Sequence, residues 1–316
     1  MVAAGRALVD SAPMSSLFRV VPRARWAGPQ RVGGYVALTT PRIIELLLVT
    51  TLPTMFVARR GVPSVGLMLA TLVGGALAAG GANAMNMVLD RDIDRVMHRT
   101  RNRPLVTGEV TPRAAVVFAL ALEAAAFVEL WLVVNLLSAL LAVAATAFYV
   151  VVYTLWLKRT SSQNIVIGGA AGAVPVLVGW AAVTGHLGWA PVVLFAVIVI
   201  WTPPHFWALA IRYRDDYAAA QVPMLPVVAT LGRTARQILL YTVLLVAVSV
   251  VFAAVAHMGP LYLVGALVLG AVFVVLALRL RRDQTPRAAM ALFRYSITYL
   301  TLLFVAMAGD VLIRFH

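Results

Sequence analysis

The sequence contains no cysteine, a single lysine (Lys158) and few charged residues of any kind. The absence of cysteine excludes disulfide bonds, thiolate metal sites and a cysteine nucleophile. Charged residues make up 12% of the chain and apolar residues 62%, whereas soluble domains carry about 25% charged residues. This composition excludes an ordinary soluble domain, and its high hydrophobicity excludes a disordered chain. We therefore expect the excess apolar surface to face lipid.

Long apolar runs recur along the chain. A helix needs about 20 mostly apolar residues to cross a bilayer, and nine runs approach or reach that length, the first being the shortest. Strict two-residue alternation, the signature of a membrane β-barrel, is missing. The sequence thus predicts an all-α, polytopic membrane protein with nine spans, near Ile43–Val57, Val65–Val88, Ala114–Val133, Ser138–Leu157, Ile165–Thr184, Ala190–Ile211, Ile238–His257, Leu261–Leu278 and Ala291–Ile313.

Acidic residues are scarce: 12 against 26 basic residues, for a net charge of +14. In a soluble protein this excess would suggest nucleic acid as a partner. Here the basic residues fall between the apolar runs. If the N-terminus is cytoplasmic, 22 of them lie in inside segments and three in outside segments, as the positive-inside rule requires. We therefore predict a cytoplasmic N-terminus, contact with membrane lipid and no nucleic-acid partner.

Residues 1–38 are polar and basic, with proline and glycine, and they lack the apolar stretch of a secretory signal. We predict a flexible cytoplasmic segment over 1–38, followed by one membrane domain over 39–316. Its arginines are also compatible with a mitochondrial transit peptide. The strong preference for arginine over lysine and the abundance of alanine favour a bacterial protein, and hence the bacterial inner membrane over the mitochondrial one.

The second apolar run ends in a row of oxygen-bearing side chains. Asn86, Asp90 and Asp94 recur every four residues, each about 40° from the last around a helix, whereas Asp92 points away. Carboxylates stacked in this way repel one another and call for a cation. Oxygen ligands without His or Cys suit Mg²⁺. The spacing predicts a Mg²⁺ site on the cytoplasmic side.

A second polar group ends the sixth run, after Trp201-Thr-Pro-Pro-His205-Phe. If the helix continues past the two prolines, His205, Arg212 and Asp216 share one face. Pro203 and Pro204 predict a break or a kink. Arginine and lysine side chains match phosphate oxygens, and three basic residues near this rim are the predicted phosphate ligands, namely Arg103, Lys158 and Arg212.

These motifs resemble the UbiA-type intramembrane prenyltransferases. Asn86-x₃-Asp90-x₃-Asp94 is similar to their first Asp-rich motif. Four stretches resemble the branch that farnesylates protoheme IX, the haem O synthases: 94–105, 153–160, 164–172, and Trp201-Thr-Pro-Pro-His205-Phe together with the second motif around Asp216. Many superfamily members carry a further aspartate four residues after this one, where Ala220 stands here.

The resemblance implies a nine-helix bundle around a central cavity. It implies transfer of a farnesyl group from farnesyl diphosphate to a vinyl group of protoheme IX, with water addition, giving haem O and pyrophosphate. It also implies one or two Mg²⁺ ions on Asn86, Asp90, Asp94 and Asp216. Asp90, Asp94, Asp216 and His205 become the expected catalytic residues, with His205 either ligating the haem iron or orienting the water. A haem A synthase or a terminal oxidase assembly is the implied recipient of the product.

Two alternatives stay open. Another enzyme of the same fold would prenylate an aromatic quinone precursor, although the stretch around His205 argues against it. A proton-coupled transporter would also use acids at the membrane edge and a broken helix. Against a transporter, the acids gather on one rim and form no relay across the bilayer.

Overall fold

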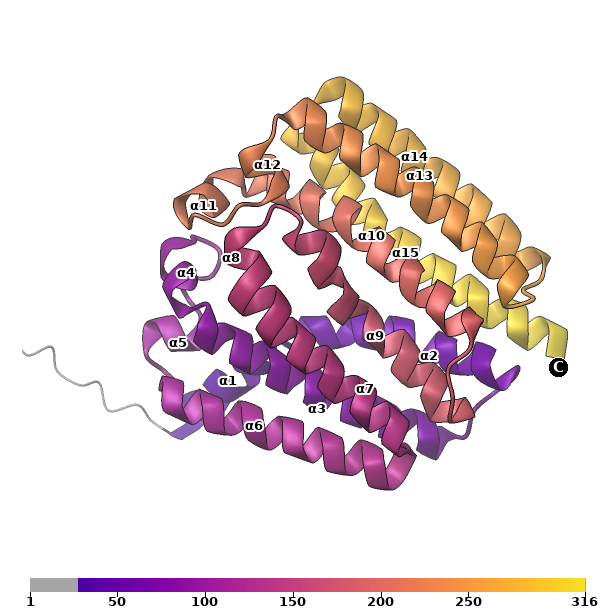
Figure 1. The fold of residues 1–316 in the computed structure, drawn as a ribbon, viewed down its shortest axis with the longest axis horizontal. Coiled ribbons are helices and arrows are strands. Elements are labelled where there is room, and N and C mark those ends of the chain that lie inside the picture. The colour runs from indigo at the N-terminus through magenta and orange to yellow at the C-terminus, as the bar shows by residue number, and fades with distance from the viewer. Residues whose placement is uncertain (1–27, 316) are drawn as a thin grey trace, which may run out of the picture.

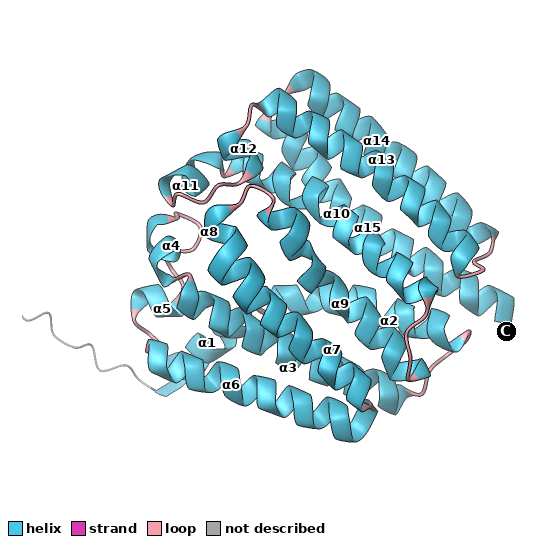
Figure 2. Ribbon diagram, in the orientation of Figure 1, coloured by secondary structure: helices cyan, strands magenta, loops and turns pink. Residues whose placement is uncertain are grey.

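The computed structural model describes residues 28–315, apart from the side chains of residues 28–31 and 42–48. All regular structure in this part of the chain is helical (Figure 2). Two segments, η2 and η3, are wider π-helical stretches. The helices are α1 (Gly28–Thr39), α2 (Pro41–Arg59), α3 (Val65–Leu89), α4 (Arg91–Val96), α5 (Pro104–Thr107), α6 (Pro112–Glu129), η2 (Leu130–Val134), α7 (Leu136–Ala147), η3 (Phe148–Leu157), α8 (Lys158–Thr160), α9 (Asn164–Thr184), α10 (Trp189–Arg212), α11 (Arg214–Ala219), α12 (Leu225–Val228), α13 (Leu231–Val255), α14 (Pro260–Asp283) and α15 (Pro286–Phe315).

Eight helical segments within the described residues are long and apolar enough to span a membrane. They match the second to ninth predicted runs and confirm a polytopic all-α membrane protein. Helix α2 corresponds to the first run and extends two residues beyond it at each end. Because part of α2 lies outside the described side chains, the count of nine spans and the cytoplasmic N-terminus stay predictions.

The boundary predicted at residue 38 falls inside a helix. Residues 28–39 form α1, whose Leu38 is fully buried and whose Tyr35 ring packs edge-on against Phe118 of α6, 5.0 Å away. Helix α1 therefore packs against the bundle, and the division of the chain into two parts stays a prediction. The rest of the predicted flexible segment, residues 1–27, lies outside the described residues.

Small residues let the spanning helices approach one another closely. An added Cβ at Gly81 of α3 would lie 2.9 Å from the backbone oxygen of Ala119 in α6, and one at Gly179 of α9 would lie 2.9 Å from that of Thr51 in α2. Glycine therefore permits backbone contacts that a larger side chain would block, as is common in membrane bundles. The outward faces carry apolar side chains such as Val117 (68% exposed) and Leu132 (72% exposed), which suits contact with lipid.

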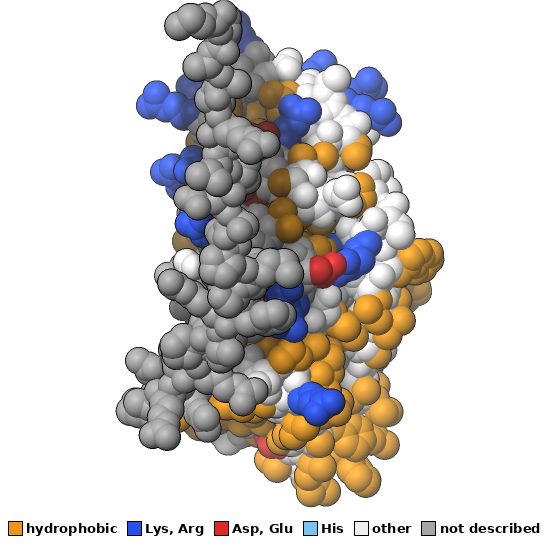
Figure 3. Space-filling view, turned by 90° about the vertical axis from the view of Figure 1, so that its left-hand side faces the viewer, with side chains coloured by type: hydrophobic (Ala, Val, Ile, Leu, Met, Phe, Trp, Pro, Cys, Tyr) orange, Lys and Arg blue, Asp and Glu red, His pale blue; other side chains and the backbone are white. Residues whose placement is uncertain are grey.

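The short helices α4, α5, α8, α11 and α12 gather at one end of the bundle (Figure 1). There the loop that follows α3 meets the loop that follows α10, and a pocket of about 350 Å³ opens between them. Figure 3 looks onto this end of the molecule, where basic side chains outnumber acidic ones on the visible face. The two long polar segments of the sequence, Asp90–Pro112 and Arg212–Arg236, thus meet at one rim. The residues that line the pocket are Asp92, Ile93, Val96, Arg159, Ala219, Ala220, Gln221 and Val222.

Helix α10 corrects the reading of the two prolines. It runs without interruption from Trp189 to Arg212 with Pro203 and Pro204 inside it, so the predicted break is wrong, while the alternative, a kink, stays a prediction. Both prolines are buried, and within a membrane bundle neighbouring helices compensate for the backbone hydrogen bonds that proline removes. The helix ends instead at Arg212, and Asp216 lies on the separate helix α11. The prediction that one helix face carries His205, Arg212 and Asp216 therefore fails for Asp216.

The approach of α3 to α6 gives a stability prediction. Gly81→Ala places a Cβ against a backbone carbonyl that has no freedom to move aside, and should destabilise the protein by about 1–3 kcal/mol. Gly66→Ala is the matched control on the same helix, because an added Cβ there meets no atom within 4 Å and alanine favours helix by about 1 kcal/mol. Thermal unfolding in neutral detergent should show a lowered Tm for Gly81→Ala only. Equal Tm values for the two variants would contradict the close approach.

Candidate functional site

The junction between α3 and α4 places the first predicted motif. Asp90 lies between the two helices, and its backbone N–H donates to Asn86 O at 2.8 Å. The N–H of Asp94 donates to Asp90 O, also at 2.8 Å. This spacing of four residues carries the helical path across the junction. Asn86, Asp90 and Asp94 consequently occupy consecutive turns.

Asp90 is fully buried and is neutralised by a residue far away in sequence. Lys158 forms an ion pair with Asp90 Oδ2, and Asn86 Nδ2 donates to the same oxygen at 2.8 Å. The other oxygen, Oδ1, is buried without a hydrogen bond, and its closest cation is Arg159 at 3.8 Å. A buried carboxylate oxygen without a partner is costly. Oδ1 is therefore an acceptor that a further cation or donor would stabilise.

The π-helical segment η3 brings two residues to Asp90. The Thr154 hydroxyl donates to Tyr149 O, five residues earlier, at 2.9 Å, and it accepts a hydrogen bond from Asn86 Nδ2 at 3.1 Å. Lys158 begins α8 directly after this segment. Wider turns of this kind are frequent at functional sites. Thr154 was missed in the sequence analysis, and a lone hydroxyl in an apolar run gave no signal for it.

Asp94 is paired with the second predicted phosphate ligand. Its side chain is 4% exposed, and Arg103 Nη1 donates to both carboxylate oxygens at 2.9 and 2.7 Å. Burial raises the pKa of the Asp94 carboxyl above its ordinary value, while Arg103 acts in the opposite direction. The loop from α4 to α5 thus folds back so that an arginine covers the acid.

Asp92 lies on the opposite side of α4, as predicted, with a side chain that is 64% exposed. Arg159 donates to both of its oxygens, at 2.7 and 2.8 Å, and to the backbone oxygen of Leu89 at 3.0 Å. The hydrogen bonds from Arg159 lower the pKa of the Asp92 carboxyl to about 2. Arg159 therefore links the start of α8 to the α3–α4 junction at the rim.

The predicted metal ligands are brought together only in part. Among residues 28–315, no three carboxylate or imidazole groups lie close enough to hold one ion. Asn86 and Asp90 touch, Asp94 is one turn further on, and the half-buried Asp216 forms no ion pair with any described residue. The vacant Asp90 Oδ1 and the all-oxygen donor set nevertheless fit a hard divalent cation.

His205 lies at the interface of α10 and α15. It is 9% exposed, its ring stacks on Trp201 and Phe293 at centroid distances of 4.3 and 4.7 Å, and its Nδ1 lies 2.7 Å from Ser296 Oγ. The Ser296 hydroxyl donates to Phe293 O at 2.6 Å, so it accepts from His205. Nδ1 therefore carries the proton and Nε2 keeps its lone pair. Ser296 was missed in the sequence analysis, since only the fold brings α15 to α10.

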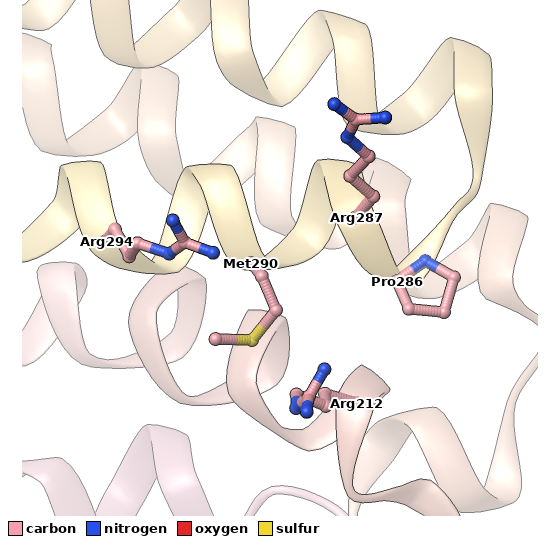
Figure 4. Close-up of a pocket in the computed structure, with 5 residues that line it drawn as sticks. All are labelled: Arg212, Pro286, Arg287, Met290 and Arg294. Carbon is pink, nitrogen blue, oxygen red and sulfur yellow. The ribbon is translucent and has the colours of Figure 1, made fainter.

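Arg212 is separated from the two aspartates. It forms no ion pair with a described carboxylate, and it lines a pocket of about 450 Å³ with Pro286, Arg287, Met290 and Arg294 of α15 (Figure 4). Arg212 therefore does not contact the Asp90 and Asp94 ion pairs, and its predicted phosphate-binding role stays a prediction.

Glu123, within the third predicted span, accepts a hydrogen bond from Thr146 at 3.0 Å, which anchors α6 to α7.

Comparison with known proteins identifies the family. The sequence profile described as the UbiA prenyltransferase family matches residues 47–305 of this chain. The chain belongs to the UbiA prenyltransferase family. A relative from Frankia alni, named protoheme IX farnesyltransferase, is 56% identical over 282 residues, which cover 88% of this chain and 97% of the relative.

Solved structures share the fold of this family member. A UbiA homologue from Aeropyrum pernix K1 superimposes with a TM-score of 0.70 at 18% identity, covering 86% of this chain and 98% of that one. A UbiA homologue from Archaeoglobus fulgidus, solved with GPP and Mg²⁺ bound, gives a TM-score of 0.62 at 16% identity, covering 87% and 99%. At this identity the likeness shows the arrangement of the helices.

The buried ion pair of Asp90 and Lys158 should contribute more to stability than the exposed pair of Asp92 and Arg159. Lys158→Met leaves a fully buried carboxylate without its cation and should lower the free energy of unfolding by about 3–5 kcal/mol. Arg159→Met, the control, removes the partner of the exposed Asp92 and should cost at most about 1 kcal/mol. Adding Asp90→Asn to Lys158→Met should restore much of the loss. The free energy of unfolding is measured in neutral detergent. Equal losses in Lys158→Met and Arg159→Met would contradict this assignment.

Proposed function

We propose that this chain transfers a farnesyl group from farnesyl diphosphate to a vinyl group of protoheme IX, giving haem O and pyrophosphate. The observation that carries the proposal is the relative named protoheme IX farnesyltransferase, which is 56% identical over nearly the full length of both chains. The stretch around His205 and the Asp90 motif belong to the same aligned region. The chain has several helices long enough to span a membrane, and the relatives that match it are bacterial. Both observations support the bacterial inner membrane as its location.

The first step breaks the allylic C–O bond of farnesyl diphosphate, and pyrophosphate leaves with the electron pair. Positive groups aimed at the departing oxygens lower this barrier. Lys158 and Arg103 each pair with an aspartate at the rim, so both cations already point at the oxygen-rich site. We assign them to the diphosphate, and Arg212 stays a predicted third ligand.

A divalent cation fits this arrangement. Asn86, Asp90, Asp94 and Asp216 would hold Mg²⁺, one ion or two, which when bound would neutralise charge on the diphosphate. The vacant Asp90 Oδ1 is the free acceptor for such an ion. Lys158 and Arg103 neutralise the same carboxylates without it. These two side chains can therefore turn to phosphate oxygens once the aspartates have another cation.

The second step forms a C–C bond between the terminal vinyl carbon and C1 of the farnesyl cation. The cation left on the other vinyl carbon takes up water, forms a C–O bond and loses a proton. His205 has an unprotonated Nε2, because Nδ1 donates to Ser296. That lone pair suits either of two roles, ligating the haem iron or orienting and deprotonating the water.

Two other activities would use the same fold differently. An aromatic quinone precursor as acceptor would share the first step and replace the haem. A proton-coupled transporter would release no pyrophosphate. The product suggests a downstream haem A synthase or terminal oxidase assembly as partner.

The decisive experiment incubates the purified chain with farnesyl diphosphate, protoheme IX and Mg²⁺, and measures pyrophosphate together with the mass of the extracted haem.

The aspartate assignment predicts which variants lose activity. Asp90→Ala and Asp94→Ala should each lower pyrophosphate release and haem O formation at least about a hundredfold, while the protein stays inserted in the membrane. Asp92→Ala is the matched control, since Asp92 is exposed and points away from the other two. Haem O formation at the rate of the unchanged chain in either Asp90→Ala or Asp94→Ala would refute the assignment.

The role of His205 can be decided through its partner Ser296. Ser296→Ala removes the acceptor that fixes the imidazole and should weaken haem binding about tenfold if His205 ligates iron, whereas Ser296→Thr keeps a hydroxyl and should bind haem normally. The Soret band of the bound haem and its Kd are the measurements, and farnesyl diphosphate binding should be unchanged in both. Normal haem binding by His205→Ala, with product formation lost, would instead assign the histidine to the water.

A further inference from the structure

Three arginines surround one pocket on the same side of the bundle as the candidate site. Arg212 closes α10, whereas Arg287 and Arg294 belong to α15, with Met290 between them. Figure 4 shows Met290 pointing toward Arg212, with Arg294 on one side and Pro286 on the other. The cavity of about 450 Å³ is of the size of known small-ligand sites.

The three arginines of this pocket are not ion-paired within the described part of the chain. Among the described side chains, no carboxylate lies within 4 Å of Arg212, Arg287 or Arg294. Arg103 and Arg159, by contrast, pair with aspartates of the candidate site. A pocket lined by three arginines without an ion-paired carboxylate is suited to an anion with several oxygens.

Helix stability does not account for the positions of two of these arginines. Arg287 is the second residue of α15, and the N-terminus of a helix disfavours positive charge. Arg294 lies seven residues further, about 10 Å deeper along the helix axis, inside a segment that is apolar enough to span the membrane. Arg294 is the fourth residue of the predicted ninth span, so its side chain can reach the headgroup region at this end of the span.

The pocket opens on the lipid side of α15. Arg294 and Val305 are eleven residues apart, which places them about 20° from each other around the helix. Val305 is 58% exposed, and Ile297, one turn from Arg294, is 42% exposed. The opposite face carries Ser296 and Leu300, both fully buried. Arg287 and Arg294 therefore lie on the lipid-facing side of α15 and not on the side toward the interior of the bundle.

We propose that this pocket binds the phosphodiester headgroup of an anionic phospholipid in the leaflet on the side of the short helices. Arg287 meets the headgroup at the rim, Arg294 reaches it from below, and Met290 and Pro286 contact its glycerol carbons. Basic pockets between membrane helices bind anionic headgroups in this manner. The proposal is independent of farnesyl transfer.

The test measures lipid binding by the full chain in neutral detergent, with native mass spectrometry. Dioleoyl phosphatidylglycerol and dioleoyl phosphatidylcholine are titrated in parallel. The unchanged chain should bind the anionic lipid at least tenfold more tightly. Each arginine near a headgroup contributes about fivefold, so Arg287→Gln with Arg294→Gln should weaken phosphatidylglycerol binding about thirtyfold. Arg287→Gln alone, a change at the exposed rim, should weaken it about fivefold and serves if the double variant unfolds.

The matched control removes two arginines from the same end of the molecule. Arg281 and Arg282 end α14, are exposed and do not line the pocket. Arg281→Gln with Arg282→Gln should change phosphatidylglycerol binding less than twofold. Equal losses in the two double variants would overturn the proposal, because they would show a general charge effect. Absence of any preference for the anionic lipid in the unchanged chain would overturn it as well.

Two further arms distinguish other anions. Inorganic phosphate is titrated against bound phosphatidylglycerol, and protoheme IX is titrated in the same way. The headgroup proposal expects neither to displace the lipid at millimolar phosphate or micromolar haem. If Arg287→Gln with Arg294→Gln lost binding of phosphate or of haem carboxylates while keeping the lipid, the pocket would serve that ligand and the proposal would be wrong.

Discussion

The burial of carboxylate groups at one end of an apolar bundle is the constraint on which the rest of the site depends. A buried carboxylate without a cation costs several kcal/mol, and Asp90 is completely buried. Lys158 supplies the charge from the end of η3, far away in the chain. The ion pair consequently holds α3 against η3, and it does so where the two long polar loops meet.

The same requirement explains the arrangement of the surrounding loop. Arg103 returns to cover Asp94, and Arg91 Nε donates to the backbone oxygen of Leu105 at 3.2 Å. A short helix, α5, then packs its buried Leu105 beneath the loop. Positive side chains at this rim are thus of two kinds. Lys158, Arg103 and Arg159 have acidic partners at Asp90, Asp94 and Asp92. Arg287 and Arg294 on the outer face of α15 form no ion pair with a described carboxylate and line the second pocket.

Much of the candidate site follows from local sequence spacing. The interval of four residues among Asn86, Asp90 and Asp94 puts them on consecutive turns even across the α3–α4 junction, because the backbone bonds keep the same offset. The outward direction of Asp92 follows from the same geometry. The prediction failed for Asp216 because α10 passes its two prolines and ends at Arg212, where the sequence has no glycine or proline to mark the end. Thr154 and Ser296 could not be found, since their roles arise from contacts between distant helices.

By itself the sequence determined the class of the protein, its spanning helices from the second to the ninth, and the row of acids at the end of α3. These depend on apolar run length and helical periodicity, which are local properties. Only the tertiary structure decided which cation meets which acid, that His205 donates to Ser296, and that Arg212 turns toward α15. Such pairings depend on how helices distant in sequence pack side by side, and no local sequence pattern encodes that packing.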